Sequence, residues 1–426
     1  MRIVDVNEYY SPTGGGVRTY LDRKMALMAE LGHELIVVAP GRETRVEHRP
    51  GGGRIHWVKA PPLVLDPAYR IFVRDEPVWA ELDRLAPDIV ETSSPWLPAW
   101  TVARWRGDAL KIFFAHNDNI GAYPQRWLER VATPLQVERA FAWYTRYMAR
   151  FLSHYDGFVT NGPALERRFT RRGLRVDAVM PLGIEREWFS PDLRDEALRA
   201  ALLAECGLPP SAHLLLGLGR HHKEKRWPMV IDAVERAATE VPVGLILIGD
   251  GVERRRLEAR IAGSPHIRIF RPVYDRARLS RVMASCDALI HGSDAEPFGL
   301  VAAEALASGV PLIGPDEGGF AEIARPAFAE TYAARDGRAA AAAICRLVAR
   351  DPATLRAAAR QAAASVRSDR DHARELTAHY AMLLARRRAA VSARPTAAAS
   401  APRAGGTAPA PARAPEPALA RVAGIA

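Results

Sequence analysis

The chain has 426 residues, a length that predicts two or three domains, each able to bury a core. Hydrophobic residues make up 48% and charged residues 25%, which excludes a wholly disordered chain, and no apolar run reaches the roughly 18–20 residues of a membrane span. The acidic residues near the start and three widely spaced cysteines match neither a secretory signal nor a disulfide framework, so we expect a cytoplasmic protein. The net charge of +10 favours an anionic partner without choosing among nucleic acid, acidic lipid and a phosphorylated small molecule.

Short runs rich in Val, Ile and Leu alternate with longer amphipathic segments along most of the chain. Continuous apolar runs are typical of strands buried on both faces, and helices between them favour parallel sheets. In the first half we expect strands at residues 2–6, 34–39, 88–91, 110–115, 157–160 and 176–180. In the second half we expect strands at residues 214–218, 244–248, 267–270, 288–291 and 310–313.

A turn-rich, proline-containing segment near residues 181–210 separates these two series. The pattern predicts an α/β protein with two doubly wound, Rossmann-like domains facing across a cleft, at residues 1–185 and 186–370. A helix at 371–390 is expected to pack across both domains. The Ala/Pro-rich tail at 391–426 is expected to be disordered, because it has too few apolar residues to anchor a core.

A run of three glycines, Gly14 to Gly16, follows the first predicted strand and precedes an amphipathic segment at 17–31. Glycine lets the backbone approach a ligand closely, and the start of a helix offers free amides to an anion. A flexible turn explains the same run equally well. Because the run matches neither a P-loop nor a dinucleotide fingerprint, ATP hydrolysis and nicotinamide binding lose support.

A second cluster of charged residues follows the strand expected at 214–218. It includes Arg220 together with Lys223 and Lys225, and the whole chain has only five lysines. The planar fork of arginine and the compact charge of lysine suit the two phosphates of a nucleoside diphosphate. The alternative is a solvated charged loop. The neighbouring histidines lack a nearby carboxylate pair at metal-ligand spacing, so a metal site is not expected.

A third cluster carries two carboxylates, Glu296 and Glu304, after the strand expected at 288–291. A helix is expected to begin near Phe298, so that the amides from Phe298 to Leu300 can hold a phosphate or sugar oxygen. Glu304 lies about two turns along that helix, within an apolar series. A carboxylate is costly to bury there without a partner, which favours a functional role over a surface one.

Together these motifs resemble those of the retaining glycosyltransferases of family 4, which have the two-domain GT-B fold. Glu296 and Glu304 stand at the spacing of that family's E-x7-E region, and Arg220 and Lys225 match its G-R-x-x-x-x-K phosphate-binding stretch. The resemblance covers residues 1–385 and leaves out the tail.

The resemblance implies roles for individual residues. Arg220 and Lys225 would bind the donor diphosphate, Glu296 would hold the transferred sugar, and Glu304 would bind the ribose. The other donor-side candidates are Gly15, Gly16, Val273, Phe298, Gly299 and Leu300. His116 is a candidate for sugar contact in catalysis, although a histidine at a strand end is as often structural. The acceptor-side candidates are Asn117, Asp118 and Tyr123.

The activity that the resemblance implies is retaining transfer of a hexose from a UDP- or GDP-linked sugar to a glycan, lipid or small-molecule acceptor. Cations and a helix dipole would stabilise the leaving diphosphate, so no metal or other cofactor is expected. In this family the leaving phosphate is usually held to take the acceptor's proton, which makes a dedicated protein base unnecessary.

Two alternatives stay open for the function: a non-catalytic basic protein that binds an anionic polymer or membrane, and a GT-B sugar-nucleotide epimerase. Nucleic acid is not an expected partner, because the cations are spread along the chain rather than grouped. The basic, aromatic stretch at 126–152 is compatible with a peripheral contact on an anionic membrane, at the inner face, beside a lipid acceptor. Aromatic residues at helical spacing more often belong to a core.

Overall fold

The computed structural model describes residues 1–11, 16–63, 66–129 and 131–392. Gly15 and nearly all of the tail predicted to be disordered lie outside these residues. Residues Met1–Leu384 form one compact unit that contains both large sheets. None of the helices in the described ranges is both long enough and apolar enough to span a bilayer.

The first sheet has eight strands in the order β10-β9-β8-β7-β1-β2-β4-β3, and every neighbouring pair is parallel except β3 with β4. Its strands are β1 (Arg2–Val6), β2 (Glu34–Gly41), β3 (Arg45–His48), β4 (Arg54–Lys59), β7 (Ile89–Thr92), β8 (Leu110–Ala115), β9 (Gly157–Thr160) and β10 (Ala178–Val179). A separate two-stranded sheet pairs β5 (Pro62–Leu63) with β6 (Asp66–Arg70).

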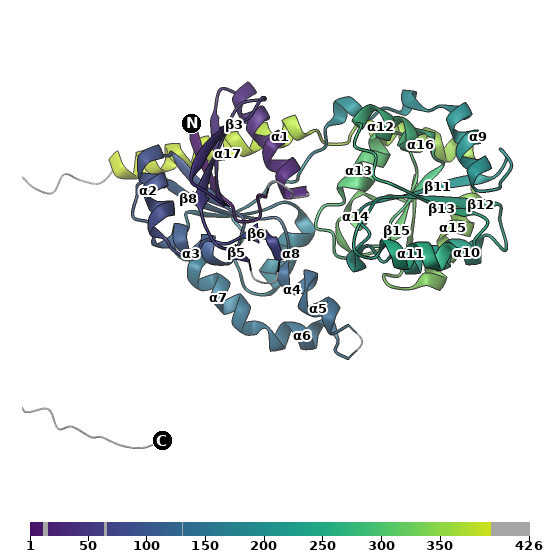
Figure 1. Ribbon diagram of the computed structural model, residues 1–426, viewed down its shortest axis with the longest axis horizontal. Helices are drawn as coiled ribbons and strands as arrows, with labels where there is room; N and C mark the ends of the chain where they lie inside the picture. Colours follow the sequence, from purple (N-terminus) through teal and green to yellow (C-terminus); the bar gives the residue numbers. More distant parts are fainter. Residues whose placement is uncertain (12–15, 64–65, 130, 393–426) are drawn as a thin grey trace, which may run out of the picture. The chain divides into compact units, whose positions relative to one another are not determined.

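The second sheet has six parallel strands in the order β13-β12-β11-β14-β15-β16 (Figure 1). Its strands are β11 (His213–Leu218), β12 (Val243–Ile248), β13 (Ile267–Phe270), β14 (Ala288–Ile290), β15 (Leu312–Pro315) and β16 (Ala329–Tyr332). In each sheet the chain builds outward from a central strand and then crosses to the other side. The predicted α/β class with two doubly wound sheets is therefore confirmed.

Helices connect the strands and cover both faces of each sheet (Figure 1). Those up to residue 171 are α1 (Gly16–Glu30), α2 (Glu76–Leu85), α3 (Leu97–Arg104), α4 (Asn119–Ala122), α5 (Pro124–Trp127), α6 (Pro134–Ala140), α7 (Ala142–Leu152) and α8 (Pro163–Arg171). The later ones are η1 (Arg186–Trp188), η2 (Pro191–Leu193), α9 (Glu196–Glu205), η3 (Lys223–Lys225), α10 (Trp227–Ala237), α11 (Arg254–Ile261), α12 (Arg276–Ser285), α13 (Leu300–Ala307), α14 (Gly318–Ile323), α15 (Gly337–Val348), α16 (Pro352–Ala363) and α17 (Asp369–Ser392).

Alternate residues of each strand enter different cores, because successive side chains point to opposite faces of a sheet. In β11, Leu214 and Leu216 pack with α9, α12 and α13, whereas Leu215 packs with α10 and α15. In β1, Ile3 packs with α1 and α17, whereas Val4 packs with α2. Both sheets are therefore buried on two faces, which explains the continuous apolar runs in the sequence.

Several predicted element boundaries were wrong. The strand expected at 176–180 is only Ala178–Val179, and the one expected at 310–313 is Leu312–Pro315. Strands β3, β4 and β16 were missed, as was the β5–β6 pair. β3 is an exposed edge strand with a charged sequence, so it carries no apolar signal.

The stretch at 126–152 contains both core aromatic residues and large apolar side chains on the surface. On α7, Tyr144, Met148 and Phe151 are buried and pack in the first sheet's core. Trp127 and Val131, by contrast, are 75% and 80% exposed. One face of this stretch is therefore core, and the other presents large apolar side chains to the surroundings.

A buried charged network joins the first sheet to α1 and α17. Lys24 Nζ lies 2.5 Å from Glu91 Oε1, and Tyr380 Oη donates a hydrogen bond of 2.5 Å to Glu91 Oε2. Asp5 lies in the same core, where burial and the neighbouring Glu91 raise its pKa to about 7. Tyr20 approaches His372 of α17 at 3.1 Å. The described part of α17 thus belongs to the first sheet's core; the expected packing across both domains and the boundary near residue 185 stay predictions.

Candidate active site

The second sheet reverses its strand order between β11 and β14, which lie side by side. Ligands of doubly wound sheets bind outside the carboxyl ends of the strands at such a switch point. The loop after β11 carries Arg220 and Lys225, and the loop after β14 carries Glu296. The fold therefore brings two of the predicted clusters, far apart in the sequence, to one edge of the sheet.

Lys225 and Glu296 form an ion pair at this edge. Lys225 is buried, and burial lowers its pKa to about 8. His291, at the end of β14, places its Nε2 atom 3.1 Å from Glu296 Oε2. That contact lacks hydrogen-bond geometry. Both atoms are buried, and neither has a hydrogen-bond partner among the described residues. The pair is thus available to polar groups of a ligand.

Burial lowers the pKa of His291 to about 3, so its ring is neutral at pH 7. The ring stacks on Phe320 with an interplanar angle of 3°, and its backbone carbonyl accepts a hydrogen bond from Tyr332 Oη. A neutral, fixed imidazole beside Glu296 leaves the charge of the carboxylate in place. His291 had been noted only as a strand end, because nothing in the sequence indicated which carboxylate it would meet.

Arg220 lies on the solvent side of the same loop. Its side chain is 70% exposed and pairs with Glu224 at 2.6 Å, while Trp227 Nε1 donates a hydrogen bond to its backbone carbonyl. Gly219 has a φ of 148°, so a side chain there would be strained. The loop backbone is therefore held in place, and the guanidinium group of Arg220 can swing toward a diphosphate.

The helix after Glu296 starts later than predicted. α13 begins at Leu300, and Gly299 caps it with a φ of 76°, so Phe298 precedes the cap. The backbone of Phe298 passes close to Gly319, where an added Cβ would lie 2.4 Å from the Phe298 carbonyl carbon. Glycine at 319 is required by this close approach, and it fixes the loop that carries the amides of Phe298, Gly299 and Leu300.

Glu304 lies on α13 and is not a free surface acid. Its side chain is 13% exposed and lies 3.3 Å from Arg276, which also pairs with Glu185 at 2.8 Å. Burial raises the pKa of Glu304 to about 7 even though Arg276 opposes the shift. Val273, another of the donor-side candidates, is partly buried and packs against the core to which α13 contributes.

The first sheet reverses its order between β1 and β7, and its candidates follow β1 and β8. Gly16 is the first residue of α1. His116 stacks on Phe114 with centroids 4.3 Å apart and meets the edge of Tyr20 at 5.0 Å. Burial and the nearby Lys24 lower the pKa of His116 to about 3, so it is neutral at pH 7. A neutral histidine at this edge can exchange hydrogen bonds with a sugar but cannot supply a positive charge.

The three acceptor-side candidates differ in their surroundings. Asn117, before α4, and Tyr123, between α4 and α5, are both exposed. Asp118 is buried, caps α4 and accepts two hydrogen bonds from Arg172, at 2.6 and 2.9 Å. The carboxylate of Asp118 is therefore used within the protein, which leaves Asn117 and Tyr123 as the accessible candidates.

Arg226 is a site residue that the sequence analysis did not single out. It adopts a left-handed conformation with a φ of 51° and donates to Asp294 at 2.8 Å and to Glu129 at 2.7 Å. It thereby joins the loop of Arg220 and Lys225 to the segment before Glu296 and to the loop before α6. Its only sequence signal was its place in the charged loop.

Comparison with known proteins agrees with this geometry. Residues 14–188 match the family model described as Glycosyltransferase Family 4, and residues 212–350 match that of Glycosyl transferases group 1. A GDP-mannose-dependent alpha-(1-6)-phosphatidylinositol dimannoside mannosyltransferase of Mycobacterium tuberculosis is 30% identical over 316 residues, which are 74% of this chain and 79% of the relative. The chain belongs to glycosyltransferase family 4.

Other relatives and structures are consistent with this membership. A GDP-mannose-dependent alpha-mannosyltransferase of Mycobacterium tuberculosis is 26% identical over 336 residues, 76% of this family 4 chain and 82% of the relative. Sucrose-phosphate synthase from Thermosynechococcus elongatus superposes with a TM-score of 0.71 at 22% identity, covering 91% of this chain and all of its own. Anabaena HepE in complex with UDP gives 0.65 at 18% identity, with 90% and 100% covered. The predicted GT-B fold and glycosyltransferase class are confirmed.

Proposed function

We propose that this glycosyltransferase is a retaining, metal-independent mannosyltransferase that uses GDP-mannose as donor. The observation that carries the proposal is the meeting of Lys225, Glu296 and His291 at the switch point of the second sheet. A cation for the diphosphate and a carboxylate for the sugar hydroxyls lie within one ligand's reach there. The printed activities of the two mycobacterial relatives support mannose and guanosine diphosphate over other hexoses and nucleotides.

In the proposed reaction the bond between the anomeric carbon of mannose and the β-phosphate oxygen breaks, and GDP leaves. The acceptor hydroxyl forms the new bond on the same face and gives its proton to the leaving phosphate. Lys225 and Arg220 stabilise the charge that grows on the phosphate, as preorganised groups in a water-poor site do. Glu296, beside the neutral His291, holds the mannose hydroxyls.

The acceptor in this proposal is a glycan or lipid, and the protein is cytoplasmic with peripheral contact at the inner membrane face. The support is a surface of exposed apolar side chains near the acceptor-side loop. These side chains are Trp96, Leu97, Tyr123, Trp127, Val131, Leu135 and Trp143. Exposed arginines flank them on α6 and α7 at Arg139, Arg146 and Arg150, which suits an anionic bilayer.

Thermal unfolding with nucleotides tests the donor assignment. GDP and GDP-mannose, each at about 100 times its dissociation constant, should stabilise the protein by about 2.7 kcal/mol, with or without EDTA. UDP and ADP at the same concentrations should raise the melting temperature less. A larger shift with UDP would overturn the guanosine assignment, and loss of the GDP shift in EDTA would overturn metal independence.

The raised pKa of Glu304 predicts a pH dependence of donor binding. If the Glu304 carboxylate accepts hydrogen bonds from the ribose, affinity rises as pH increases through about 7, where the group ionises. GDP should therefore bind about five- to tenfold more weakly at pH 6 than at pH 8 from this source. In Glu304→Gln this component should vanish, leaving the titrations of Lys225 and of GDP itself. Equal pH profiles of the two proteins by calorimetry would remove Glu304 from the ribose site.

A further inference from the structure

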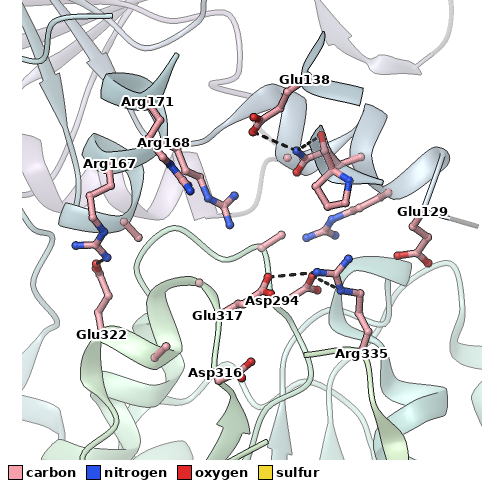
Figure 2. Close-up of a pocket in the computed structure, with 18 of the residues that line it drawn as sticks. Glu129, Glu138, Arg167, Arg168, Arg171, Asp294, Asp316, Glu317, Glu322 and Arg335 are labelled. Carbon is pink, nitrogen blue, oxygen red and sulfur yellow. Dashed lines mark hydrogen bonds and ion pairs between the residues drawn. The ribbon is translucent and has the colours of Figure 1, made fainter. Parts of the chain in front are cut away.

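A cavity of about 840 Å³ lies beside the proposed catalytic loop and has not been given a role above (Figure 2). Seven arginines and six carboxylates line it, and we call it the arginine cavity. Its volume is that of a small-molecule site. Asp294 and Ala295, just before Glu296, form part of its wall, and so does Arg226, next to Lys225. A ligand in the cavity would therefore lie next to the reacting groups without occupying the diphosphate loop.

The carboxylates of the arginine cavity all have partners. Glu322 pairs with Arg167 at 2.8 Å, and Glu129 pairs with Arg226 at 2.7 Å. Asp294 is held by the same Arg226 at 2.8 Å.

The other three acids are also occupied. Glu317 lies 3.3 Å from Arg335, and Glu138 accepts a hydrogen bond of 2.9 Å from Arg172, which is not part of the lining. Asp316 accepts a hydrogen bond from the backbone amide of Ala334 at 3.0 Å. Five of the six carboxylates of the lining are thus paired with an arginine, and Asp316 is held by a backbone amide.

Four of the seven arginines of the lining have no carboxylate closer than 3.6 Å among the described residues. One of them, Arg325, instead donates to the backbone carbonyls of Glu322 and Ala324. Arg168 lies 3.6 Å from Asp118, whose oxygens are already taken by Arg172. For Arg171, three residues further along α8, the described residues supply neither a hydrogen bond nor an ion pair. Figure 2 shows the side chains of Arg168 and Arg171 in the cavity, and no dashed line reaches either. Arg126, opposite them in the lining, has a buried Nε atom without a hydrogen-bond partner.

Such a set of guanidinium groups suits a phosphate. Residues three apart on a helix face the same side, so Arg168 and Arg171 can offer two planar forks to one tetrahedral anion. Arginine binds phosphate with two parallel hydrogen bonds, and its charge is kept at all physiological pH values. Burial lowers the pKa of Arg126, although the nearby Asp294, Glu224 and Glu129 oppose the shift. A bound anion would offset the cost of burying this cation.

We propose that Arg126, Arg168 and Arg171 bind a phosphate group carried by the acceptor, so that the enzyme selects phosphate-bearing acceptors. The donor's phosphates are assigned to Arg220 and Lys225, and neither of these side chains lines the cavity. The assignment of this phosphate to the acceptor rests on the proposed function. The phosphate site itself is inferred from the charged residues that line the cavity. The phosphate is either a lipid headgroup phosphodiester or a soluble phosphate ester.

Calorimetric titration of the full chain, saturated with GDP to fill the diphosphate loop, tests the site with inorganic phosphate as probe. The double variant Arg168→Gln/Arg171→Gln should bind phosphate at least tenfold more weakly than wild type. Arg255→Gln is the matched control, because this exposed arginine of α11 lies outside the cavity and removes one charge of the same kind. It should change phosphate affinity less than twofold.

Two outcomes would overturn the proposal. One is equal phosphate affinity in the double variant and wild type, with the melting temperature showing that both are folded. The other is a parallel loss of GDP affinity, which would place the arginines in the donor site. Unchanged GDP binding with lost phosphate binding in the double variant supports the phosphate site, even if the enzyme proves to use a different sugar. The phosphate site and the proposed function are therefore tested separately.

Vesicles distinguish the two sources of phosphate. Wild type and the double variant are compared for sedimentation with phosphatidylcholine vesicles that contain phosphatidylinositol, and for binding of glycerol 1-phosphate. Loss of both in the double variant assigns the site to a lipid headgroup. Loss of glycerol 1-phosphate binding alone assigns it to a soluble phosphate ester, and both results support the site.

Discussion

Lys225→Met is expected to lower kcat/KM for sugar transfer by about 10²- to 10³-fold, the usual cost of one preorganised group that stabilises transition-state charge. Lys225 is buried, so its charge acts through a poorly screening medium. Methionine keeps the aliphatic length that packs beside Gly219 and Trp227 and removes only the charge. GDP release from GDP-mannose, followed with and without an added glycan acceptor, measures the loss.

The lowered pKa of Lys225 adds a signature to the same experiment. Because the cation is lost as pH rises through about 8, kcat/KM of wild type should fall above pH 8. A bound diphosphate raises that pKa, so the corresponding fall in kcat should come at higher pH. In Lys225→Met, neither the fall in kcat/KM nor the fall in kcat at high pH should remain.

Lys223→Met is the matched control for this prediction. Lys223 is exposed two residues earlier in the same loop, and its loss should change kcat/KM less than about threefold, as expected for a screened surface charge. Equal losses in the two variants would mean that the loop acts only through its overall charge. Full activity of Lys225→Met would remove the residue from the site.

Much of the fold could be predicted, because parallel strands buried on both faces leave a plain apolar signal. β8 (Leu110–Ala115) and β9 (Gly157–Thr160) were predicted to the residue for this reason. β4 (Arg54–Lys59) begins and ends with charged residues and contains His56, so its burial becomes visible only once it pairs with β2. Pairing between distant segments is a property of the tertiary structure, and the apolar pattern does not specify it.

The same limit applies to the candidate site. The residue types at Lys225 and Glu296 predicted phosphate and sugar contacts, but their ion pair depends on β11 and β14 being neighbours. The apolar series around Glu304 favoured a functional role for this carboxylate, and nothing in the sequence pointed to its neighbour Arg276. Arg168 belongs to no motif, and only the fold shows that it faces Asp118, whose oxygens already accept hydrogen bonds from Arg172. The function of a residue could thus be predicted where a sequence motif includes it. Contacts between residues that are distant in the sequence could not be predicted, because they form only in the folded chain.

Lys24→Met should destabilise the protein by about 3–5 kcal/mol, the cost of removing one partner of a buried ion pair. The side chains of Lys24 and Glu91 are 2% and 0% exposed, so no water replaces the lost charge. Glu91 would then share the core with Asp5, and only the Tyr380 hydroxyl would remain on its other oxygen. Because total stabilities are about 5–15 kcal/mol, the variant should lose a large part of its resistance to urea.

The double variant Lys24→Met/Glu91→Gln separates the charge from the packing. A neutral amide costs far less to bury than an unpaired carboxylate, and it can still accept a hydrogen bond from Tyr380. The double variant should therefore be more stable than Lys24→Met alone, a departure from additivity of about 1–3 kcal/mol. Lys59→Met, at an exposed lysine of β4, should stay within about 0.5 kcal/mol of wild type. Strictly additive losses in urea unfolding would show that Lys24 contributes by packing alone. A positive coupling would instead identify this network as the device that attaches α17 to the first sheet, because Glu91 contacts Lys24 and Tyr380 together.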